Sequence, residues 1–302
     1  MDLKSKIILI YGPTASGKSD FAIKLAKKIK GEIVNADSMQ VYKELKILTA
    51  RPLKKNSQKI KHHLYGFKNS KKDFSTGDWL KTVAKKIKEI QKRKKIPILV
   101  GGTGLYFRAL TEGLVEIPEI PIKFRSKIRL LQKFIGQKKF YKKLLKIDPL
   151  IINYIKSTDV QRSIRAYEIK LFTKKSITEW HKSTKSKFNK KDFFKIYIDY
   201  PRTELIEKIN LRTRQMLNMG AILEVKNFLK LRISKNKSIT KAIGVAEIKD
   251  FIQKKIVEEE VIEKISIKTR QYAKRQATWA RGHMKSWKKI EPKRLNSFLK
   301  KI

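Results

Sequence analysis

Residues 7–19 read Ile-Ile-Leu-Ile-Tyr-Gly-Pro-Thr-Ala-Ser-Gly-Lys-Ser, and Gly12, Gly17, Lys18 and Ser19 match the spacing G-x-x-x-x-G-K-[ST]. The motif follows a short apolar run that predicts a buried strand, and it precedes a segment with helical periodicity. The glycines let the backbone curl so that successive N–H groups point at phosphate oxygens. The start of the helix and Lys18 add positive charge, and the Ser19 hydroxyl can hold a Mg²⁺. This stretch predicts an α/β protein that binds a phosphate or a diphosphate.

Composition narrows the class of protein further. The chain has 302 residues and no cysteine, which excludes disulfides and thiolate zinc sites and fits a reducing compartment. No apolar run approaches the length of a membrane span, so we expect a cytoplasmic protein that is not in the membrane. The net charge is +47, from 74 Lys and Arg against 27 Asp and Glu. A polyanionic partner such as nucleic acid explains this excess, and a compositional bias toward lysines that solvate helix faces is the alternative.

Two further buried strands point to the same edge of a sheet. The run 32–36 delivers Asp37 and Ser38 to its carboxyl end, where ligands bind in open α/β sheets. Asp37 is therefore a candidate site residue, with a turn or helix cap as the alternative. The run 96–100 leads into Gly101-Gly102-Thr103-Gly104, which would let a ligand approach the backbone closely. A nucleotide hydrolase usually carries an acidic residue there to help hold Mg²⁺, so its absence disfavours ATPase chemistry.

The middle of the chain predicts a helical insertion. Pro118 and Pro121 mark a boundary, after which residues 122–191 are basic and helical in pattern, with no good strand. Arg162 and Arg165 share a helix face that could grip phosphates or a base, or could simply be solvated. We expect a core formed by residues 1–117 and 193–302, with the insertion at 118–192.

The remaining segments leave alternatives open. The pair His62-His63 is expected to be structural, with a phosphate contact as the alternative, and Ser75 to Asp78 predicts a capping box. The run 194–200 predicts a late strand that is followed by a helix with several arginines. These arginines could neutralise the far side of a diphosphate or be surface charges; they are Arg202, Arg212 and Arg214. The run 269–282 predicts a basic helix whose Tyr272 and Trp279 face either RNA or the core.

Taken together, the motifs resemble the tRNA dimethylallyltransferase (isopentenyltransferase) family, of bacterial type. The matching stretches are Gly12 to Ser19, Asp37-Ser38-Met39-Gln40-Val41-Tyr42, His62-His63-Leu64, Phe74-Ser75, Val100 to Tyr106, Gln161-Arg162 with Arg165 and Glu168, and Arg270 to Gly282. They occur in order over nearly the whole chain. The combination is far more specific than the phosphate loop, which many kinases share.

The resemblance implies a fold and a reaction. The fold is a P-loop NTPase-like α/β core, with a parallel sheet flanked by helices and an inserted helical domain. The reaction transfers a dimethylallyl group from dimethylallyl diphosphate to N6 of the adenosine 3′ of the anticodon in tRNA. Mg²⁺ is the expected cofactor, held by Ser19. The expected partner is the anticodon stem-loop of tRNA, bound by a protein that is a monomer.

The resemblance also implies roles for individual residues. Asp37 is the general base, Thr103 lies in the channel, and Lys18 binds the diphosphate and assists catalysis. The diphosphate-binding residues are Gly12, Pro13, Thr14, Ala15, Ser16, Gly17, Lys18 and Ser19, with Arg212 and Arg214 stabilising the leaving group. The tRNA-binding residues are Asp37, Ser38, Met39, Gln40, Thr103, Arg125, Gln161, Arg162, Ser163, Ile164 and Arg165.

Two features of the chain depart from the family pattern, and two other functions are alternatives. Family members usually carry an aromatic residue where this chain reads Ala242-Ile243-Gly244-Val245, which puts an anticodon-stem contact in doubt. The chain also ends without the zinc-finger extension of eukaryotic relatives. A P-loop kinase acting on a small molecule is the main alternative, and a non-catalytic RNA-binding module with a relic phosphate loop is the other.

Overall fold

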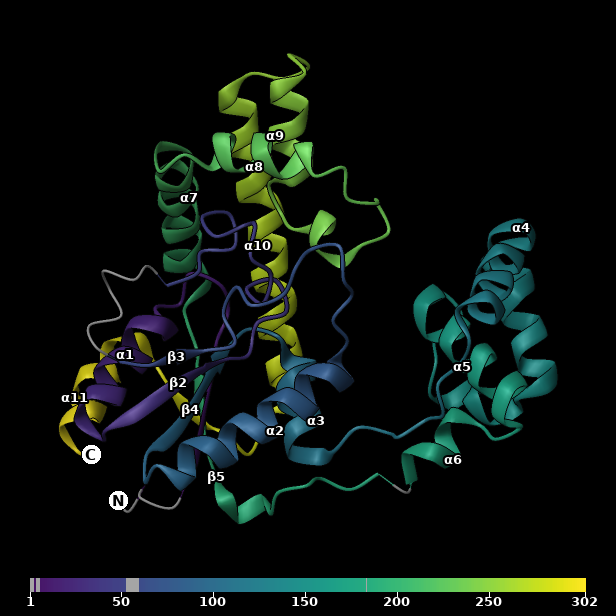
Figure 1. Cartoon of the computed structure of the whole chain (residues 1–302), viewed down its shortest axis with the longest axis horizontal. Helices are drawn as coiled ribbons and strands as arrows, with labels where there is room; N and C mark the ends of the chain where they lie inside the picture. The colour runs from purple at the N-terminus through teal and green to yellow at the C-terminus, as the bar shows by residue number, and fades with distance from the viewer. Residues whose placement is uncertain (1–2, 4–5, 53–59, 183) are drawn as a thin grey trace. The chain divides into compact units, whose positions relative to one another are not determined.

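The structure is a computed structural model that describes residues 3, 6–52, 60–182 and 184–302. The chain divides into two compact units (Figure 1). One unit comprises Met1–Thr111 with Phe188–Ile302, and the other comprises Glu112–Lys187. The sequence placed the insertion at 118–192, so the observed unit begins and ends a few residues earlier.

A parallel sheet of six strands forms the centre of the first unit, in the order β3-β2-β4-β1-β5-β6. The strands are β1 (Ile7–Tyr11), β2 (Gly31–Asn35), β3 (His62–His63), β4 (Ile96–Gly101), β5 (Phe193–Ile198) and β6 (Lys288–Ile290). The predicted α/β fold is confirmed, and the four predicted strands are present with ends shifted by one or two residues. The strands β3 and β6 were not predicted, because two or three residues are too few to show a strand period.

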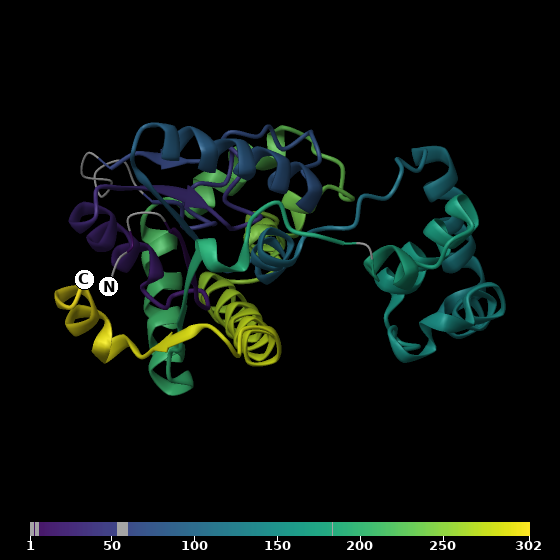
Figure 2. The ribbon, with the colours of Figure 1, turned by 90° about the horizontal axis from the view of Figure 1, so that it is seen from below.

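Alternation along β1 separates the two cores on either side of the sheet. Ile7, Leu9 and Tyr11 pack against α2 (Thr76–Lys92) and α3 (Gly104–Glu112). Ile8 and Ile10 pack against α1 (Lys18–Lys28) and α11 (Leu295–Lys300). Figure 2 shows the blue α2 and the yellow α11 on opposite sides of the sheet. Every residue of β1 is therefore buried, which is expected of a central parallel strand.

The C-terminal helices form a third apolar cluster beside the sheet. They are α7 (Arg202–Asn218), α8 (Ala221–Lys230), α9 (Val245–Ile252) and α10 (Glu258–His283), with the 3₁₀ turn η4 (Ser238–Lys241) between α8 and α9. Two further 3₁₀ turns lie outside this cluster: η3 (Lys190–Asp192) precedes β5 and η5 (Pro292–Arg294) follows β6. Helix α10 begins in the cluster that α8 and α9 make with residues 41–48, and it ends against the sheet (Figure 1). The predicted helix 269–282 is the second half of α10. Trp279 lies 5.9 Å from the ring of Tyr11 and packs on the core.

The second unit consists of helices in the residues that the structure describes. It contains α4 (Ile122–Ile147), η2 (Pro149–Asn153), α5 (Val160–Thr173) and α6 (Ile177–Lys182) around one apolar cluster. Helix α4 is interrupted at Gly136, which has a left-handed φ of 75°. Asp159 caps α5, since its side chain accepts a hydrogen bond from the Arg162 N–H at 3.0 Å.

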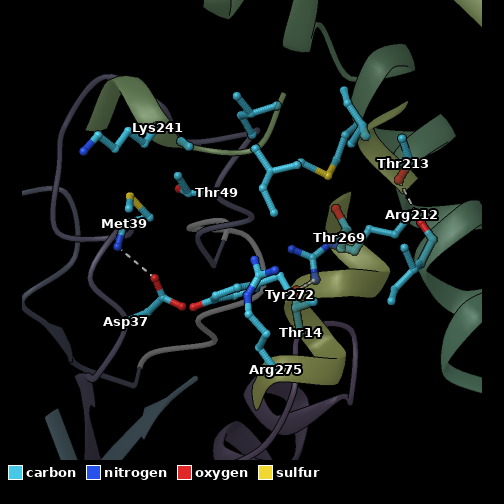
Figure 3. Close-up of a pocket in the computed structure, with 16 residues that line it drawn as sticks. Thr14, Asp37, Met39, Thr49, Arg212, Thr213, Lys241, Thr269, Tyr272 and Arg275 are labelled. Atoms are coloured by element: carbon cyan, nitrogen blue, oxygen red, sulfur yellow. Dashed lines mark hydrogen bonds between the residues drawn. The ribbon is translucent and has the colours of Figure 1, made fainter. Parts of the chain in front are cut away.

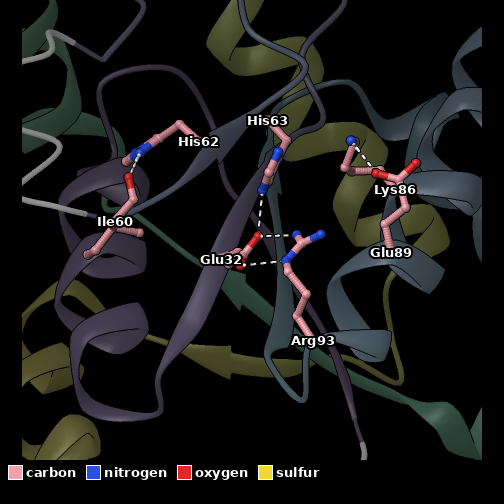
Figure 4. A network of polar contacts seen from close by, with 7 residues as sticks. All are labelled: Glu32, Ile60, His62, His63, Lys86, Glu89 and Arg93. Carbon is pink, nitrogen blue, oxygen red and sulfur yellow. Dashed lines mark hydrogen bonds and ion pairs between the residues drawn. The ribbon is translucent and has the colours of Figure 1, made fainter.

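The predicted capping box is also confirmed. The Ser75 hydroxyl accepts from the Asp78 N–H at 3.1 Å, and the Asp78 carboxylate accepts from the Ser75 N–H at 3.0 Å. At the other end of α2, the carboxylate of Glu32 on β2 is buried and lies 2.7 Å from His63 Nε2 on β3 and 2.6 Å from Arg93 Nη2, the residue that follows α2 (Figure 4). His63 therefore has a structural role at the edge of the sheet.

We expect the free energy of unfolding to depend on pH through Glu32. Burial raises the pKa of Glu32, but the hydrogen bonds from Arg93 and His63 outweigh it and bring the pKa below its ordinary 4.5. A carboxylate with a lowered pKa in the folded protein stabilises the fold above about pH 4.5, and this stabilisation is lost as the pH falls through the lowered pKa. Glu32→Gln should lower the free energy of unfolding at pH 7 by about 1–3 kcal/mol, and the difference from wild type should shrink below pH 4.5.

Urea unfolding at several pH values measures this difference. Glu89→Gln is the matched control, because Glu89 pairs with Lys86 on the surface of the neighbouring α2 (Figure 4). A Glu32 effect that is the same at pH 7 and pH 3.5 would contradict the assignment.

Candidate functional site

The phosphate loop joins β1 to α1. Gly17 precedes the helix with a left-handed φ of 75°, which favours glycine. The Lys18 ammonium donates to the Pro13 carbonyl at 3.0 Å, and residues 14–17 form a turn that leads directly into α1. The N-terminus of α1 thus faces the carboxyl edge of the sheet, where its positive end can bind an anion.

Asp37 follows β2 and combines the two roles that the sequence left open. Its Oδ1 accepts from the Met39 N–H at 2.9 Å and the Gln40 N–H at 3.4 Å, so the side chain caps a turn. Asn35 holds the same turn, because its side chain bonds the Asp37 N–H and C=O, each at 2.9 Å. Figure 3 shows the other oxygen of Asp37 pointing into a cavity toward Tyr272 of α10. One oxygen therefore fixes the carboxylate while the other can act on a ligand.

A small cavity of about 70 Å³ brings the phosphate loop, Asp37 and Arg212 together. Its lining includes Lys18 and Ser19 from α1, Asp37 from the turn after β2, and Arg212 from α7. Arg212 Nη1 also donates to the Thr14 hydroxyl at 3.3 Å. A carboxylate and two cations thus share one space, which suits a polyanion next to a group that loses a proton.

Burial changes the proton affinity of both cations. Burial and, to a smaller extent, the charge of Arg212 lower the pKa of Lys18 to about 8, against the opposing effect of Asp37. Burial likewise lowers the pKa of Arg212, and Asp37 partly restores it. A bound anion would stabilise the charged forms of both side chains and so raise both pKa values again.

A larger cavity of about 270 Å³ shares Thr14, Asp37, Arg212 and Tyr272 with the small one (Figure 3). Much of its remaining lining is apolar. Leu48, Met216, Ala242, Ile243 and Ile265 come from the helical cluster, and Ile209 comes from the side of α7 that packs on Ala273 of α10. An apolar group attached to a bound diphosphate has space here. Val245, at the departure from the family pattern, is buried in the helical cluster.

Thr103 lies beside the Asp37 turn. Its hydroxyl accepts from the Ser38 N–H at 3.0 Å and donates to the Ser38 hydroxyl at 3.3 Å. The glycines around it serve packing within the chain: a Cβ on Gly101 would lie 2.0 Å from the Ala36 carbonyl oxygen, and one on Gly102 would lie 2.1 Å from Gln276 Nε2. The sequence explained these glycines by the approach of a ligand, whereas the chain itself makes the close approach.

Gln276 of α10 is a residue that sequence reasoning missed. Its buried amide accepts from the Thr14 N–H at 2.8 Å and donates to the Gly102 carbonyl at 2.9 Å. One side chain thus connects the phosphate loop to the turn after β4. The sequence gives only a slight signal for this role. Gln276 lies one helical turn after Tyr272 in a basic segment, and this spacing alone sets it apart.

Several predicted site residues lie elsewhere. Arg214 points away from Arg212 around α7 and lines a separate pocket with Glu259 and Glu263. In the second unit, Ser163 and Ile164 are buried, whereas Gln161 and Arg162 are exposed. The half-buried Arg125 and Arg165 and the exposed Arg129 surround the buried carboxylate of Glu168. The contacts with tRNA that were predicted for Arg125 and for residues 161–165 stay predictions.

The described residues contain no group of three or more His, Cys, Asp or Glu residues that could hold a metal ion. No helix formed by these residues is long and apolar enough to cross a membrane.

The fold and the cavity define an α/β protein whose phosphate loop, suited to an anion, lies next to a single carboxylate. Comparison with known proteins gives the family. The model of the IPP transferase family matches residues 40–283, and the chain belongs to this family.

Individual relatives and solved structures agree with this assignment. The chain is 63% identical to the tRNA dimethylallyltransferase of Pelagibacter ubique over 100% of its own length and 96% of the relative's, and 42% identical to that of Rhizobium etli over 94% and 97%. A crystal structure of the tRNA isopentenylpyrophosphate transferase from Bacillus halodurans has a TM-score of 0.70 at 30% identity, covering 98% and 95% of the two chains. A eukaryotic dimethylallyltransferase acting on tRNA has a TM-score of 0.83 at 28% identity, covering 95% of this chain and 74% of that one.

We expect Gln276→Glu to destabilise the protein. The new carboxylate keeps an acceptor for the Thr14 N–H but places an oxygen against the Gly102 carbonyl, so the free energy of unfolding should fall by about 1–3 kcal/mol. Urea unfolding measures the loss. Gln91→Glu on the exposed face of α2 is the control, and it should change the free energy by less than about 0.5 kcal/mol. Equal losses in the free energy of unfolding for the two variants would show that the hydrogen bonds of Gln276 to Thr14 and Gly102 do not stabilise the fold.

We expect anion binding to weaken at alkaline pH because Lys18 loses its charge. With the pKa of Lys18 near 8, the affinity of the wild-type protein for inorganic pyrophosphate should fall as the pH rises above 8. The arginine of Lys18→Arg stays charged over this range, so the affinity of wild type should fall by up to about tenfold per pH unit relative to this variant. Calorimetric titrations from pH 7 to 9.5 give the two profiles. Both proteins are titrated with the same ligand, so protonation of pyrophosphate affects the two affinities equally. Affinities of wild type and Lys18→Arg that change in parallel with pH would refute the role of Lys18.

Proposed function

We propose that this chain is a tRNA dimethylallyltransferase that moves the dimethylallyl group of dimethylallyl diphosphate to N6 of the adenosine 3′ of the anticodon in tRNA. The observation that carries the proposal is the cavity in which Lys18, Ser19 and Arg212 face Asp37. The names of the relatives support the reaction class. The transfer takes place in the cytoplasm. That the protein acts as a monomer stays a prediction.

The cations suit the leaving group. As the allylic C–O bond breaks, its electron pair goes to the diphosphate oxygen, and negative charge grows next to Lys18 and Arg212. Charges that are fixed in advance in a partly buried cavity stabilise such a transition state without reorganising. The apolar lining of the adjoining larger cavity gives the dimethylallyl group a place beside its diphosphate.

Asp37 suits the incoming nucleophile. The N6 amine forms the new C–N bond and becomes acidic as it does so, and its proton passes to the free oxygen of Asp37. The Met39 and Gln40 N–H groups keep the other oxygen in place. A general base needs only to be within hydrogen-bond reach of the proton that it accepts. Adenine N6 is not accessible in a stacked loop, so the base must leave the stack.

Mg²⁺ fits the oxygen donors of the small cavity. Mg²⁺ is usually held by one or two protein oxygens together with substrate phosphates and water. The Ser19 hydroxyl, next to the diphosphate position, would be a ligand, and Asp37 lines the same space. When bound, the ion would supply additional positive charge for the diphosphate oxygens.

The tRNA contacts are proposed on both units. Near the cavity they are Asp37, Ser38, Met39, Gln40 and Thr103, and in the second unit they involve the exposed and half-buried groups Gln161, Arg162, Arg165 and Arg125. The total charge of +47 fits an RNA partner.

We expect purified protein to form N6-(dimethylallyl)adenosine when it is mixed with tRNA, dimethylallyl diphosphate and Mg²⁺ in the absence of ATP. Nucleoside mass analysis detects the product. Asp37→Ala should reduce turnover by about 10²–10⁴-fold, because the general base is lost, while tRNA binding remains. ATP consumption with a small hydroxylated substrate and no need for RNA would instead identify a kinase. Unchanged turnover in Asp37→Ala would refute the role of this carboxylate.

A further inference from the structure

Glu224 binds backbone amides of a segment far away in the sequence. The residue lies in the first turn of α8, and its Oε1 accepts from the Lys46 N–H at 2.6 Å and the Ile47 N–H at 2.8 Å. Its Oε2 accepts from the Leu48 N–H at 2.9 Å. Successive N–H groups that converge in this way commonly bind an anion, and here a carboxylate of the chain takes that position.

The residues that follow form a wall of the site. Thr49 and Ala50 line the small cavity together with Lys18 and Ser19. The Gln40 amide donates to the Thr49 carbonyl at 2.8 Å and to the Ala50 carbonyl at 3.2 Å. The segment 46–50 is thus held by Glu224 at its start and by Gln40 at its end.

The same segment packs against the next loop that lines the larger cavity. A Cβ on Gly244 would lie 2.4 Å from Leu48 Cδ1, so the two loops are in close contact. Glu247 of α9 accepts from the Gly244 N–H at 2.8 Å and holds this second loop in turn. The walls of both cavities therefore depend on carboxylates of the helical cluster, outside the cavities themselves.

We propose that Glu224 is a positioning residue that holds segment 46–50 in the conformation that binds the diphosphate. Without its carboxylate the three N–H groups lose their acceptor, the segment moves, and Thr49 and Ala50 no longer close the cavity. The inference rests on the proposed function only in naming the ligand as the donor's diphosphate.

Electrostatics alone gives the opposite expectation. Glu224 is a negative charge near a cationic site, and it interacts favourably with Arg51 on the same loop. If the residue acted only through its charge, its removal would strengthen anion binding. The two explanations therefore differ in the direction of the change.

The test is calorimetric titration of the full chain with inorganic pyrophosphate. Glu224→Ala should bind about tenfold more weakly than wild type, since charge-assisted hydrogen bonds that hold the wall are lost. Glu224→Gln keeps the shape and one acceptor, so its affinity should fall between the two. Glu207→Gln, an exposed carboxylate on the helix that carries Arg212, is the matched control and should bind as wild type or slightly more tightly. Tighter or unchanged binding in both Glu224 variants would overturn the proposal.

Amide hydrogen exchange gives a second readout that needs no turnover. The N–H groups of Lys46, Ile47 and Leu48 should exchange faster in Glu224→Gln than in wild type, while the amides of β1 keep their rates. Unchanged exchange at these three positions would also overturn the proposal. Failure of the proposed function is seen separately, as wild-type protein that forms no modified adenosine.

Discussion

The site depends on keeping Lys18 and Arg212 close together beside one carboxylate. Burial lowers the pKa of both groups because it removes water from the charged forms, and the charge of Arg212 lowers the pKa of Lys18 further. Asp37 offsets part of this effect, but one negative charge does not balance two positive ones. A multiply charged anion between them would complete the balance, so the arrangement favours a diphosphate over a neutral ligand.

Rigidity is the second requirement, and the structure meets it with contacts distant in sequence. Asp37 uses one oxygen to cap its own turn, so the other has a fixed direction. Gln276 ties the phosphate loop to the turn after β4, and Thr103 ties that turn to Ser38. Groups oriented in this way need not reorganise during a reaction, so they can stabilise the charges of a transition state without that energetic cost. The long α10 matters because it brings Gln276 from the helical cluster to the edge of the sheet.

Local patterns in the sequence predicted much of this arrangement. The phosphate loop, the apolar run of β1 and the capping box at Ser75 depend on neighbours within a few residues, so the sequence displays them directly. Gln276 and Glu224 act on partners more than 170 residues away, and nothing local marks them. Helical phase could have separated Arg212 from Arg214, because residues two apart on a helix face different directions. The same periodicity buries Ser163 and Ile164 beside the exposed Arg162.

The edge of the sheet also bears on the choice between transfer and hydrolysis. A nucleotide hydrolase usually carries an acidic side chain near the end of such a strand, but in this chain Gly101 and Gly102 lie against the Ala36 carbonyl and the Gln276 amide. Any side chain at either glycine would collide with these groups, so the packing itself keeps a second carboxylate from this position. Asp37 is then the sole carboxylate among the residues lining the two cavities that contain it. A single carboxylate whose free oxygen is directed into the cavity is suited to accept a proton from a nucleophile, and the phosphate loop opposite is left to hold the group that departs.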